Sequence, residues 1–442
     1  MHHQALMLPT AGESLSGPNN QRCYTPRDYH LDPWPWSIED YMQALQGLKI
    51  LHAPIEIAGN MARICRRLRA RGLEATDANY YDSWLGYSNT ISLHLNAMAQ
   101  PQAKAAMREF ARRAVEEYDI FHFHWAKSLL EDYSDLPEIA QRGKKIVFSF
   151  WGSDCASLEW IFYNQARFLG YDPPRPYFLS RTHVRVHQVI DHYAEAIVGL
   201  LRVPRWIYFP GAIDLDQWDI ALKHQLFASL GFHKDPSKVY FVHAPTKTEK
   251  KGSSLIIKLF QEAARDLPIE LIVVQGRKPQ EAKRIFSLAD FAIDQVGGGT
   301  FGAFGLEMMA WGVPVLVHHD ELLWRLRGGP PVIPITKANF REQLQRCVEI
   351  KMSGELEELG AKCRQWVERW AAIEAWVDDY IIMYGKIVMG EPIAHVIDMD
   401  WRRQQQGIVR GHKSEFYRFM KRYNVFEQLG ISPPDYDRAL YY

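Results

Sequence analysis

The chain has 442 residues, and its 52 lysines and arginines balance 52 aspartates and glutamates, so the formal net charge is zero. A protein whose main task is to grip nucleic acid needs a basic surplus, and this balance argues against that class of partner. The length predicts two or three domains. The five cysteines are widely spaced and form no zinc-ribbon or disulfide pattern, which favours a reducing, cytoplasmic location.

The first 46 residues are rich in proline and glycine and predict an irregular N-terminal extension that ends in a short helix. From Leu48 onward, apolar runs of strand length alternate with stretches of helical periodicity. The predicted strands are Leu48–Ala53, Ile120–His124, Lys145–Phe150, Ala194–Gly199, Val239–Ala244, Glu270–Gln275, Phe291–Gln295, Val313–Val317 and Val332–Ile335. Their nearly continuous apolarity is typical of parallel strands that are buried on both faces.

Strands and helices that alternate in two successive blocks predict an α/β protein with two doubly wound domains. We expect one Rossmann-like domain at residues 47–208 and a second at 209–370, with a hinge near Pro204–Asp216. Residues 371–442 predict a helical segment followed by a polar tail. In such folds ligands bind beyond the carboxyl ends of the strands, so the loops that follow the strands are the candidate sites.

The most informative of these loops follows Gln295 and reads VGGGTFGAFGLE, from Val296 to Glu307. Glycines let the backbone approach a ligand, and the N-terminus of the next helix offers amides that suit phosphate. The Glu307 carboxylate can accept hydrogen bonds from two hydroxyls, as recognition of a ribose requires. The same loop matches a dinucleotide fingerprint through Gly297, Gly299 and Gly302, which keeps an NAD-dependent oxidoreductase as an alternative.

His122 and His124 point to the same face of their predicted strand. Two histidines at this spacing can bind a metal, but no acidic residue or cysteine nearby completes a ligand set, so we expect no metal. His124 lies nearer the carboxyl end and is the better active-site candidate. The helix that starts at Met61 is rich in arginine, which favours a solvated surface and leaves open a peripheral contact with the inner face of a membrane.

The stretch from Ala289 to Val315, ADFAIDQVGGGTFGAFGLEMMAWGVPV, resembles the donor-nucleotide motif of the retaining glycosyltransferases of the large family 4 type. Further similar segments occur in the family's order at Ile57–Asn60, His122–His124, Trp151–Asp154, Pro210–Asp214, His243–Pro245 and Lys250–Gly252. The resemblance covers roughly residues 48–384 and is stronger in the second domain. It implies the GT-B fold, in which two Rossmann-like, doubly wound parallel-sheet domains face each other across a cleft and a C-terminal helix crosses back to the first domain.

The resemblance also implies an activity. The expected reaction moves a hexose-type sugar from a UDP- or GDP-sugar to an acceptor hydroxyl with retention of configuration, without a metal or other cofactor. The acceptor would be a carbohydrate or a lipid-linked molecule. A GT-B protein that binds nucleotide sugars without transferring them is the other alternative.

Carried over residue by residue, the resemblance assigns catalytic roles to His124 beside the transferred sugar, Lys251 at the diphosphate and Glu307 at the ribose. It assigns donor binding to Gly59, Asn60, Lys247, Arg277, Gly299, Thr300, Phe301, Gly302 and Glu307, and acceptor binding to Asn60, Trp84 and Asp154. Two positions depart from the family pattern. Gly299 stands where the family often has a glutamate that contacts the donor sugar, and Pro245 stands where it usually has a basic residue that Lys247 or Arg277 would replace.

Overall fold

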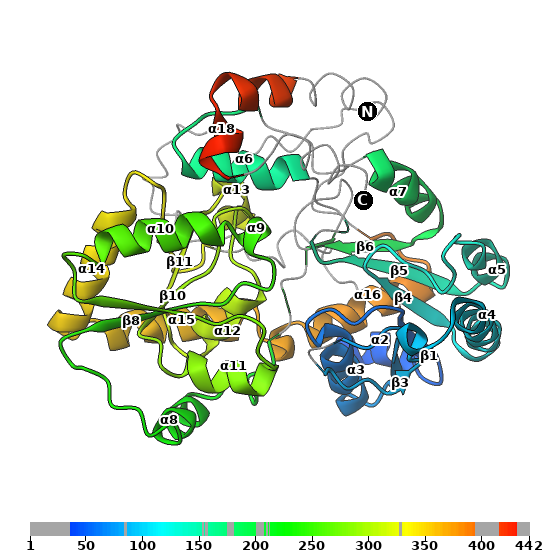
Figure 1. Ribbon diagram of the computed structural model, residues 1–442. Coiled ribbons are helices and arrows are strands. Elements are labelled where there is room, and N and C mark those ends of the chain that lie inside the picture. Colours follow the sequence, from blue (N-terminus) through cyan, green and yellow to red (C-terminus); the bar gives the residue numbers. More distant parts are fainter. Residues whose placement is uncertain are drawn as a thin grey trace, which may run out of the picture.

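The computed structural model describes residues 36–83, 86–152, 154, 158–174, 181–199, 207–208, 211, 213–326, 329–393 and 415–430. Within these ranges the chain forms two parallel sheets, each with helices packed against it, in two domains that lie side by side (Figure 1). The predicted α/β class with two doubly wound parallel sheets is therefore confirmed.

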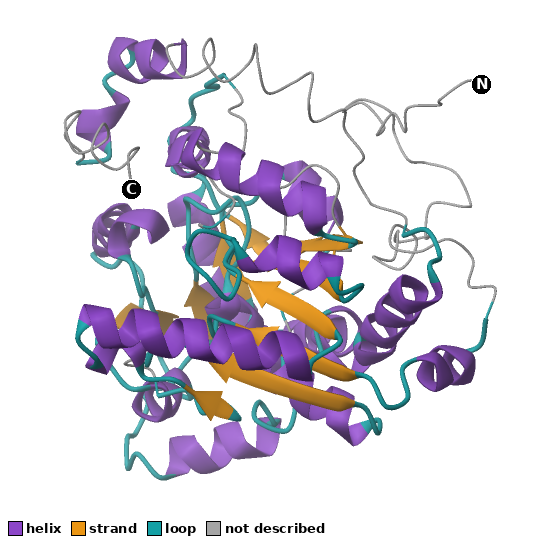
Figure 2. Cartoon of the chain, turned by 90° about the vertical axis from the view of Figure 1, so that its right-hand side faces the viewer, coloured by secondary structure: helices purple, strands orange, loops and turns teal. Residues whose placement is uncertain are grey.

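The first sheet has the strand order β3-β2-β1-β4-β5-β6-β7, and all its neighbours pair in parallel. Its strands are β1 (Lys49–Ala53), β2 (Glu74–Asn79), β3 (Ile91–Ser92), β4 (Ile120–His124), β5 (Lys145–Phe150), β6 (Ala196–Gly199) and β7 (Ile207–Tyr208). The helices of this half are α3 (Asn60–Ala70), α4 (Gln100–Glu117), α5 (Asp135–Gln141), α6 (Leu158–Phe168) and α7 (Arg181–Tyr193). Figure 2, which views the molecule from the side of this domain, shows the strands running side by side among the helices.

The strand β2 has the sequence EATDAN, which is too polar to be predicted as a strand from apolarity. Its inward-facing Asp77 is almost fully buried, and it is tolerated because Thr90 donates to it through both its amide and its hydroxyl, at 2.8 and 2.7 Å. The side-chain amide of Asn89 adds a third hydrogen bond of 3.0 Å. These bonds replace the water that the carboxylate loses on burial.

The second sheet has the order β12-β11-β10-β8-β9 and is also parallel throughout. Its strands are β8 (Val239–His243), β9 (Ile269–Val273), β10 (Phe291–Ile293), β11 (Val315–Val317) and β12 (Ile333–Pro334), each within a predicted strand or overlapping it. The helices of this half are α8 (Ile220–Ala228), α9 (Thr248–Lys251), α10 (Ser253–Ala263), α11 (Pro279–Phe286), α12 (Ala303–Ala310), α13 (Glu321–Leu326), α14 (Phe340–Ser353) and α15 (Leu356–Trp370).

The C-terminal helix α16 (Val377–Met389) leaves the second domain and packs against the first. Its residues Tyr380 to Tyr384 share one buried apolar cluster with Ile50 of β1 and with Tyr41 of α2 (Ile38–Ala44). The predicted row of C-terminal aromatic rings, from Trp366 to Tyr384, is buried throughout and serves packing. At the crossing point Ile213 and Ala372 form a parallel bridge, so the two connections between the domains lie side by side.

The arginines of α3 pair with acidic groups of the same chain. Arg66 and Arg67 both bind the buried carboxylate of Asp214, and Arg67 also pairs with Asp216 at 3.1 Å and with Glu374 at 2.5 Å. These ion pairs fasten α3 to both connections between the domains. They give Arg66 and Arg67 a structural role that does not require contact with a membrane. Among the described residues, none of the helices combines the length and apolarity that a bilayer crossing requires.

Gly385 of α16 makes the packing of this helix testable. A Cβ atom added there would lie 2.7 Å from the Cβ of Tyr41, which is too close for real atoms. Although alanine favours helix by about 1 kcal/mol over glycine, Gly385→Ala is expected to lower the free energy of unfolding by about 1–3 kcal/mol through overpacking. Urea unfolding measures the change. In a Tyr41→Gly background, which removes this Cβ atom, the same substitution should cost much less, and equal costs in both backgrounds would refute the contact.

Candidate functional site

The strand order changes direction between β8 and β10 in the second sheet, and ligands of doubly wound sheets bind at such a point. The two loops that follow these strands interlock. The Val296 amide donates to the Lys251 carbonyl at 3.1 Å, and Gly252, with φ of +70°, lies so close that an added Cβ would collide with the Val296 side chain. The loops are therefore held against each other by the backbone.

Asp294, directly after β10, organises this point. Its carboxylate is fully buried, accepts from the Lys251 ammonium at 2.5 Å and accepts from the Gly302 amide at 2.5 Å. Gly302 is the residue that precedes α12, so the carboxylate already occupies the amide that we expected to meet phosphate. A lysine ammonium has three donors, and Asp294 fixes its position by taking one of them.

Glu307 lies in α12 and faces the first domain. Burial raises its pKa to about 7, and the cations of Arg63 and Lys283 oppose that rise. In turn, burial and the charge of Glu307 raise the pKa of Tyr87 to about 12. Arg63 and Tyr87 belong to the first domain, so the structure brings residues of both domains around this carboxylate.

Gly59 and Asn60 begin α3 and lie beside the same group of residues. An added Cβ on Gly59 would lie 3.2 Å from the Arg63 guanidinium and 3.5 Å from the Tyr87 ring. The N-terminus of α3 is already occupied, because the Glu56 carboxylate accepts from the amides of Met61 and Ala62 at 3.2 and 3.1 Å. Gly59 and Glu307 thus share the neighbours Arg63 and Tyr87 where the two domains meet, and the charge of Lys251 also acts on Glu307.

The other predicted donor residues are either exposed or buried. Lys247 and Arg277 are exposed, at the start of α9 and between β9 and α11. The Phe301 ring is buried in the second-domain core against Trp366, 5.6 Å between centroids. Thr300 is buried, and its carbonyl accepts from the Gln295 side chain at 2.5 Å.

Two of the predicted acceptor residues need separate mention. Trp84 lies outside the described residues. Asp154 is buried, and its carboxylate accepts from the amides of Trp151 at 3.1 Å and of Gly152 at 2.7 Å. It therefore closes the turn that follows β5, and its binding of an acceptor stays a prediction.

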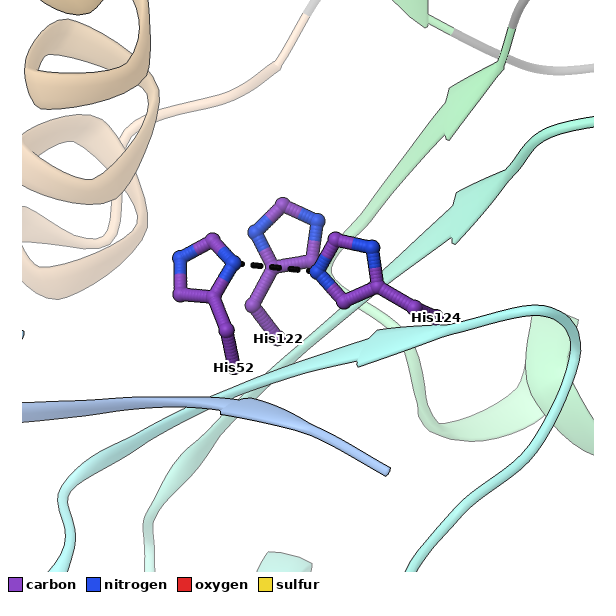
Figure 3. Close-up of side chains that lie close together, drawn as sticks. All are labelled: His52, His122 and His124. Carbon is purple, nitrogen blue, oxygen red and sulfur yellow. Dashed lines mark hydrogen bonds between the residues drawn. The ribbon is translucent and has the colours of Figure 1, made fainter. Parts of the chain in front are cut away.

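His124 belongs to a buried cluster with His52 and His122 at the point where β1 and β4 meet, which is where the strand order of the first sheet changes direction (Figure 3). His52 Nδ1 lies 3.0 Å from His124 Nε2, and His52 Nε2 lies 3.0 Å from the hydroxyl of Tyr384. That hydroxyl is 2.5 Å from His122 Nδ1, and His122 Nε2 is 2.6 Å from the hydroxyl of Ser149.

The chemistry of Trp151 fixes the direction of this chain. Its indole N–H, which can only donate, donates to His124 Nδ1 at 2.9 Å. Neutral His124 must then donate from Nε2 to His52, and His52 from Nε2 to Tyr384. His52 and His124 are thereby neutral Nε2–H tautomers. The ring nitrogens of His122 contact the hydroxyls of Tyr384 and Ser149, each of which can donate or accept.

Burial agrees with this assignment. It lowers the pKa of His52 to about 3 and holds the pKa of His122 and His124 well below the usual value. The three rings offer nitrogen atoms that lie within 4.8 Å of one another, close enough to be considered as metal ligands. The hydrogen-bond chain uses every one of those nitrogens, so it accounts for the cluster without a metal. His124 has no exposed surface, and its contact with a sugar stays a prediction.

No known family model matches the sequence, and no curated protein matches it. Among solved structures, the chain is similar to sucrose-phosphate synthase from Thermosynechococcus elongatus, with a TM-score of 0.50 and 13% identity over 78% of this chain and 100% of that one. The chain has the GT-B fold. Lower TM-scores are found with starch synthase IV from Arabidopsis thaliana (0.45, 11% identity, 78% and 100% covered) and with the galactosyltransferase WaaB (0.46, 11%, 77% and 100%).

The residues that organise this GT-B site were not all visible in the sequence. Neither Asp294 nor Glu56 was singled out from the sequence. Asp294 directly follows the buried strand β10 and Glu56 shortly precedes the N-terminus of α3, and both positions are usable signals. Arg63 was interpreted only as part of a basic helix surface. The side chains of α6 that reach the second domain carried no signal, because only the tertiary arrangement brings them there.

The neutral histidine cluster predicts a loss of stability in acid. Below about pH 6.5 the histidines of the unfolded chain bind protons, whereas the buried histidines of the folded chain stay neutral. The free energy of unfolding therefore falls by about 1.4 kcal/mol per pH unit for each such histidine. His52→Gln should therefore reduce the fall in unfolding free energy between pH 6 and pH 5 by about 1 kcal/mol, and the exposed His233→Gln should leave it unchanged. Urea titrations at both pH values measure the difference. Equal pH dependence in the two variants would refute a neutral His52.

Proposed function

We propose that this protein is a glycosyltransferase that moves a sugar from a nucleotide-diphosphate sugar to an acceptor hydroxyl. The observation that carries the proposal is that the buried Asp294 carboxylate holds the Lys251 ammonium at the strand-order reversal of the second sheet, with the Glu307 carboxylate in the helix that follows. Lys251 and Gly302 are held by the same Asp294 carboxylate, and Glu307 follows within the next helix. The fold and the sequence resemblance point to the same class of reaction.

The chemistry of such a transfer is mostly electrostatic. The departing diphosphate develops negative charge, and a lysine that is already in place stabilises it without reorganisation. In the proposed complex the Lys251 ammonium uses its remaining donors for the diphosphate, while Glu307 accepts from the ribose hydroxyls. We propose retention of configuration and no requirement for a metal, because the resemblance is to retaining enzymes that use protein cations at the leaving group.

The partners and the location follow from the same proposal. The donor is a UDP- or GDP-sugar, and the acceptor is a carbohydrate or a lipid-linked molecule bound by the first domain. A cytoplasmic protein would meet both, with a lipid-linked acceptor reached at the inner face of a membrane. A dinucleotide site also needs an acidic residue about 20 positions after its glycines to bind the ribose. Asp320 stands at a suitable distance, but it is buried beside Arg167 at 3.6 Å and its amide donates to the Gly299 carbonyl, so the NAD alternative lacks support.

A thermal-shift screen with UDP, GDP, ADP and NAD tests the class of ligand. We expect a concentration-dependent rise in Tm with UDP or GDP, since a ligand that binds only the folded state stabilises it. An increase with NAD alone would overturn the proposal. Binding of the nucleotide sugar with no release of nucleoside diphosphate, over a set of carbohydrate acceptors, would favour the non-catalytic alternative.

Substitution of the two charged residues tests their roles. Lys251→Met combined with Asp294→Asn removes the buried pair without leaving a lone charge, and it should reduce donor turnover about 100-fold or more. Glu307→Gln keeps the shape and should weaken nucleotide binding about 10- to 100-fold, the value of a hydrogen bond to a charged group. Calorimetry and diphosphate release measure these effects. The exposed Lys104→Met on α4 serves as a charge control, and full turnover in both site variants would refute the assignment.

A further inference from the structure

The helix α6 lies over the second domain beside α13 (Figure 1), and it contacts the glycine-rich loop of that domain. The Trp160 indole donates to the Gly298 carbonyl at 3.2 Å, and the Gln165 side-chain amide donates to the Glu249 carbonyl of α9 at 2.9 Å. Asn164 lies against Gly299, where an added Cβ would be 2.8 Å from the Asn164 Oδ1 atom. One face of α6 thus lies beside the loops that carry Lys251 and Gly302.

Two buried oxygen atoms on this face have no hydrogen-bond partner within the described part of the chain. They are Oδ1 of Asn164, a residue with 0% exposure, and Oε1 of Gln165, with 2% exposure. Exchanging O and N in these amides would not satisfy them. The Asn164 NH₂ group donates to the Trp160 carbonyl at 2.9 Å, and the Gln165 NH₂ group donates to the Glu249 carbonyl, and a carbonyl can only accept.

An unpaired buried acceptor is costly, and two on neighbouring residues call for an explanation. The group that would pair with them must donate hydrogen bonds. Phosphate and carboxylate groups at neutral pH only accept, so they do not suit these atoms. Sugar hydroxyls donate, and they would lie next to the diphosphate that Lys251 is proposed to hold.

We propose that Asn164 and Gln165 bind the sugar hydroxyls of the nucleotide-sugar donor, so that the first domain supplies this contact where the second domain has only Gly299. The inference rests on the proposed function and assigns its sugar-binding residues. Because the two oxygens are buried against the loop, the sugar must enter between α6 and the loop to reach them.

The test compares nucleotide with nucleotide sugar. Calorimetry gives Kd values for UDP, UDP-glucose, GDP and GDP-mannose with the full-length protein and with Asn164→Ala. We expect the variant to bind the free nucleotide with the same Kd as the wild-type protein. Its Kd for the nucleotide sugar should be about tenfold higher, which corresponds to the loss of about one hydrogen bond. Gln165→Ala should act in the same direction.

A matched control is Gln343→Ala on α14, because Oε1 of Gln343 also has no partner among the described residues but lies away from the glycine-rich loop. This variant should change neither affinity. The Tm of ligand-free Asn164→Ala should stay equal or rise, since an unpaired acceptor is removed, whereas a purely structural role would lower it.

Three results would overturn the inference: equal weakening for nucleotide and nucleotide sugar, unchanged affinity for both, or a lowered Tm that accounts for the loss. Failure of the unchanged protein to bind any of the four probes is a different outcome. It would refute the proposed function itself, and the sugar-binding role of α6 with it.

Discussion

The return of α16 to the first sheet is the constraint on which the arrangement of the two domains depends. The chain completes the second-domain core with α15, crosses at Ala372 and then buries α16 among residues of the first domain. The hydrophobic effect drives this step, because Tyr380 to Ile387 would otherwise expose a large apolar face. The same helix carries Tyr384, whose hydroxyl joins His52 to His122. The crossing helix therefore supplies both apolar packing and the central link of a buried polar network.

The candidate site shows a common physical pattern at two helix N-termini. Glu56 occupies the start of α3, and Asp294 occupies the start of α12. A helix N-terminus attracts negative charge, and a carboxylate of the chain satisfies it in each case. These bonds hold the loops in place before any ligand arrives. A phosphate would bind beside Asp294 through the remaining donors of Lys251.

The sequence was sufficient for the fold class, because parallel strands buried on both faces leave nearly unbroken apolar runs such as Phe121 to Phe123 and Val239 to Val242. It was insufficient to predict the strand β2, because the buried Asp77 in this strand is satisfied by hydrogen bonds from Thr90, which lies outside the strand. Glu307 and Lys251 could be singled out because they lie beside glycine turns at strand ends. His124 was singled out because it lies at the carboxyl end of its strand. Its neighbours His52 and Tyr384 come from segments far away in the sequence, so its full burial could not be foreseen.

The same distinction holds for the glycine-rich loop. Its glycines predicted a close approach of some partner to the backbone, and the structure shows that Asn164 of α6 is one such partner at Gly299. A run of glycines in the sequence indicates that some group packs closely against the backbone there, but it does not identify that group. Residues that act across a domain boundary, such as Asn164 and Arg63, can be recognised only when both domains are placed.

The parallel bridge between Ile213 and Ala372 has a mechanical consequence. Backbone hydrogen bonds hold the two connections together, and Asp214 fastens them to α3. This arrangement resists sliding of the domains past each other and permits rotation about the line of the bridge. For a given angle of rotation, displacement grows with distance from this line. A small opening rotation would therefore leave the arginine pairs of α3 with Asp214 intact, while contacts far from the bridge between Ile213 and Ala372 would separate more.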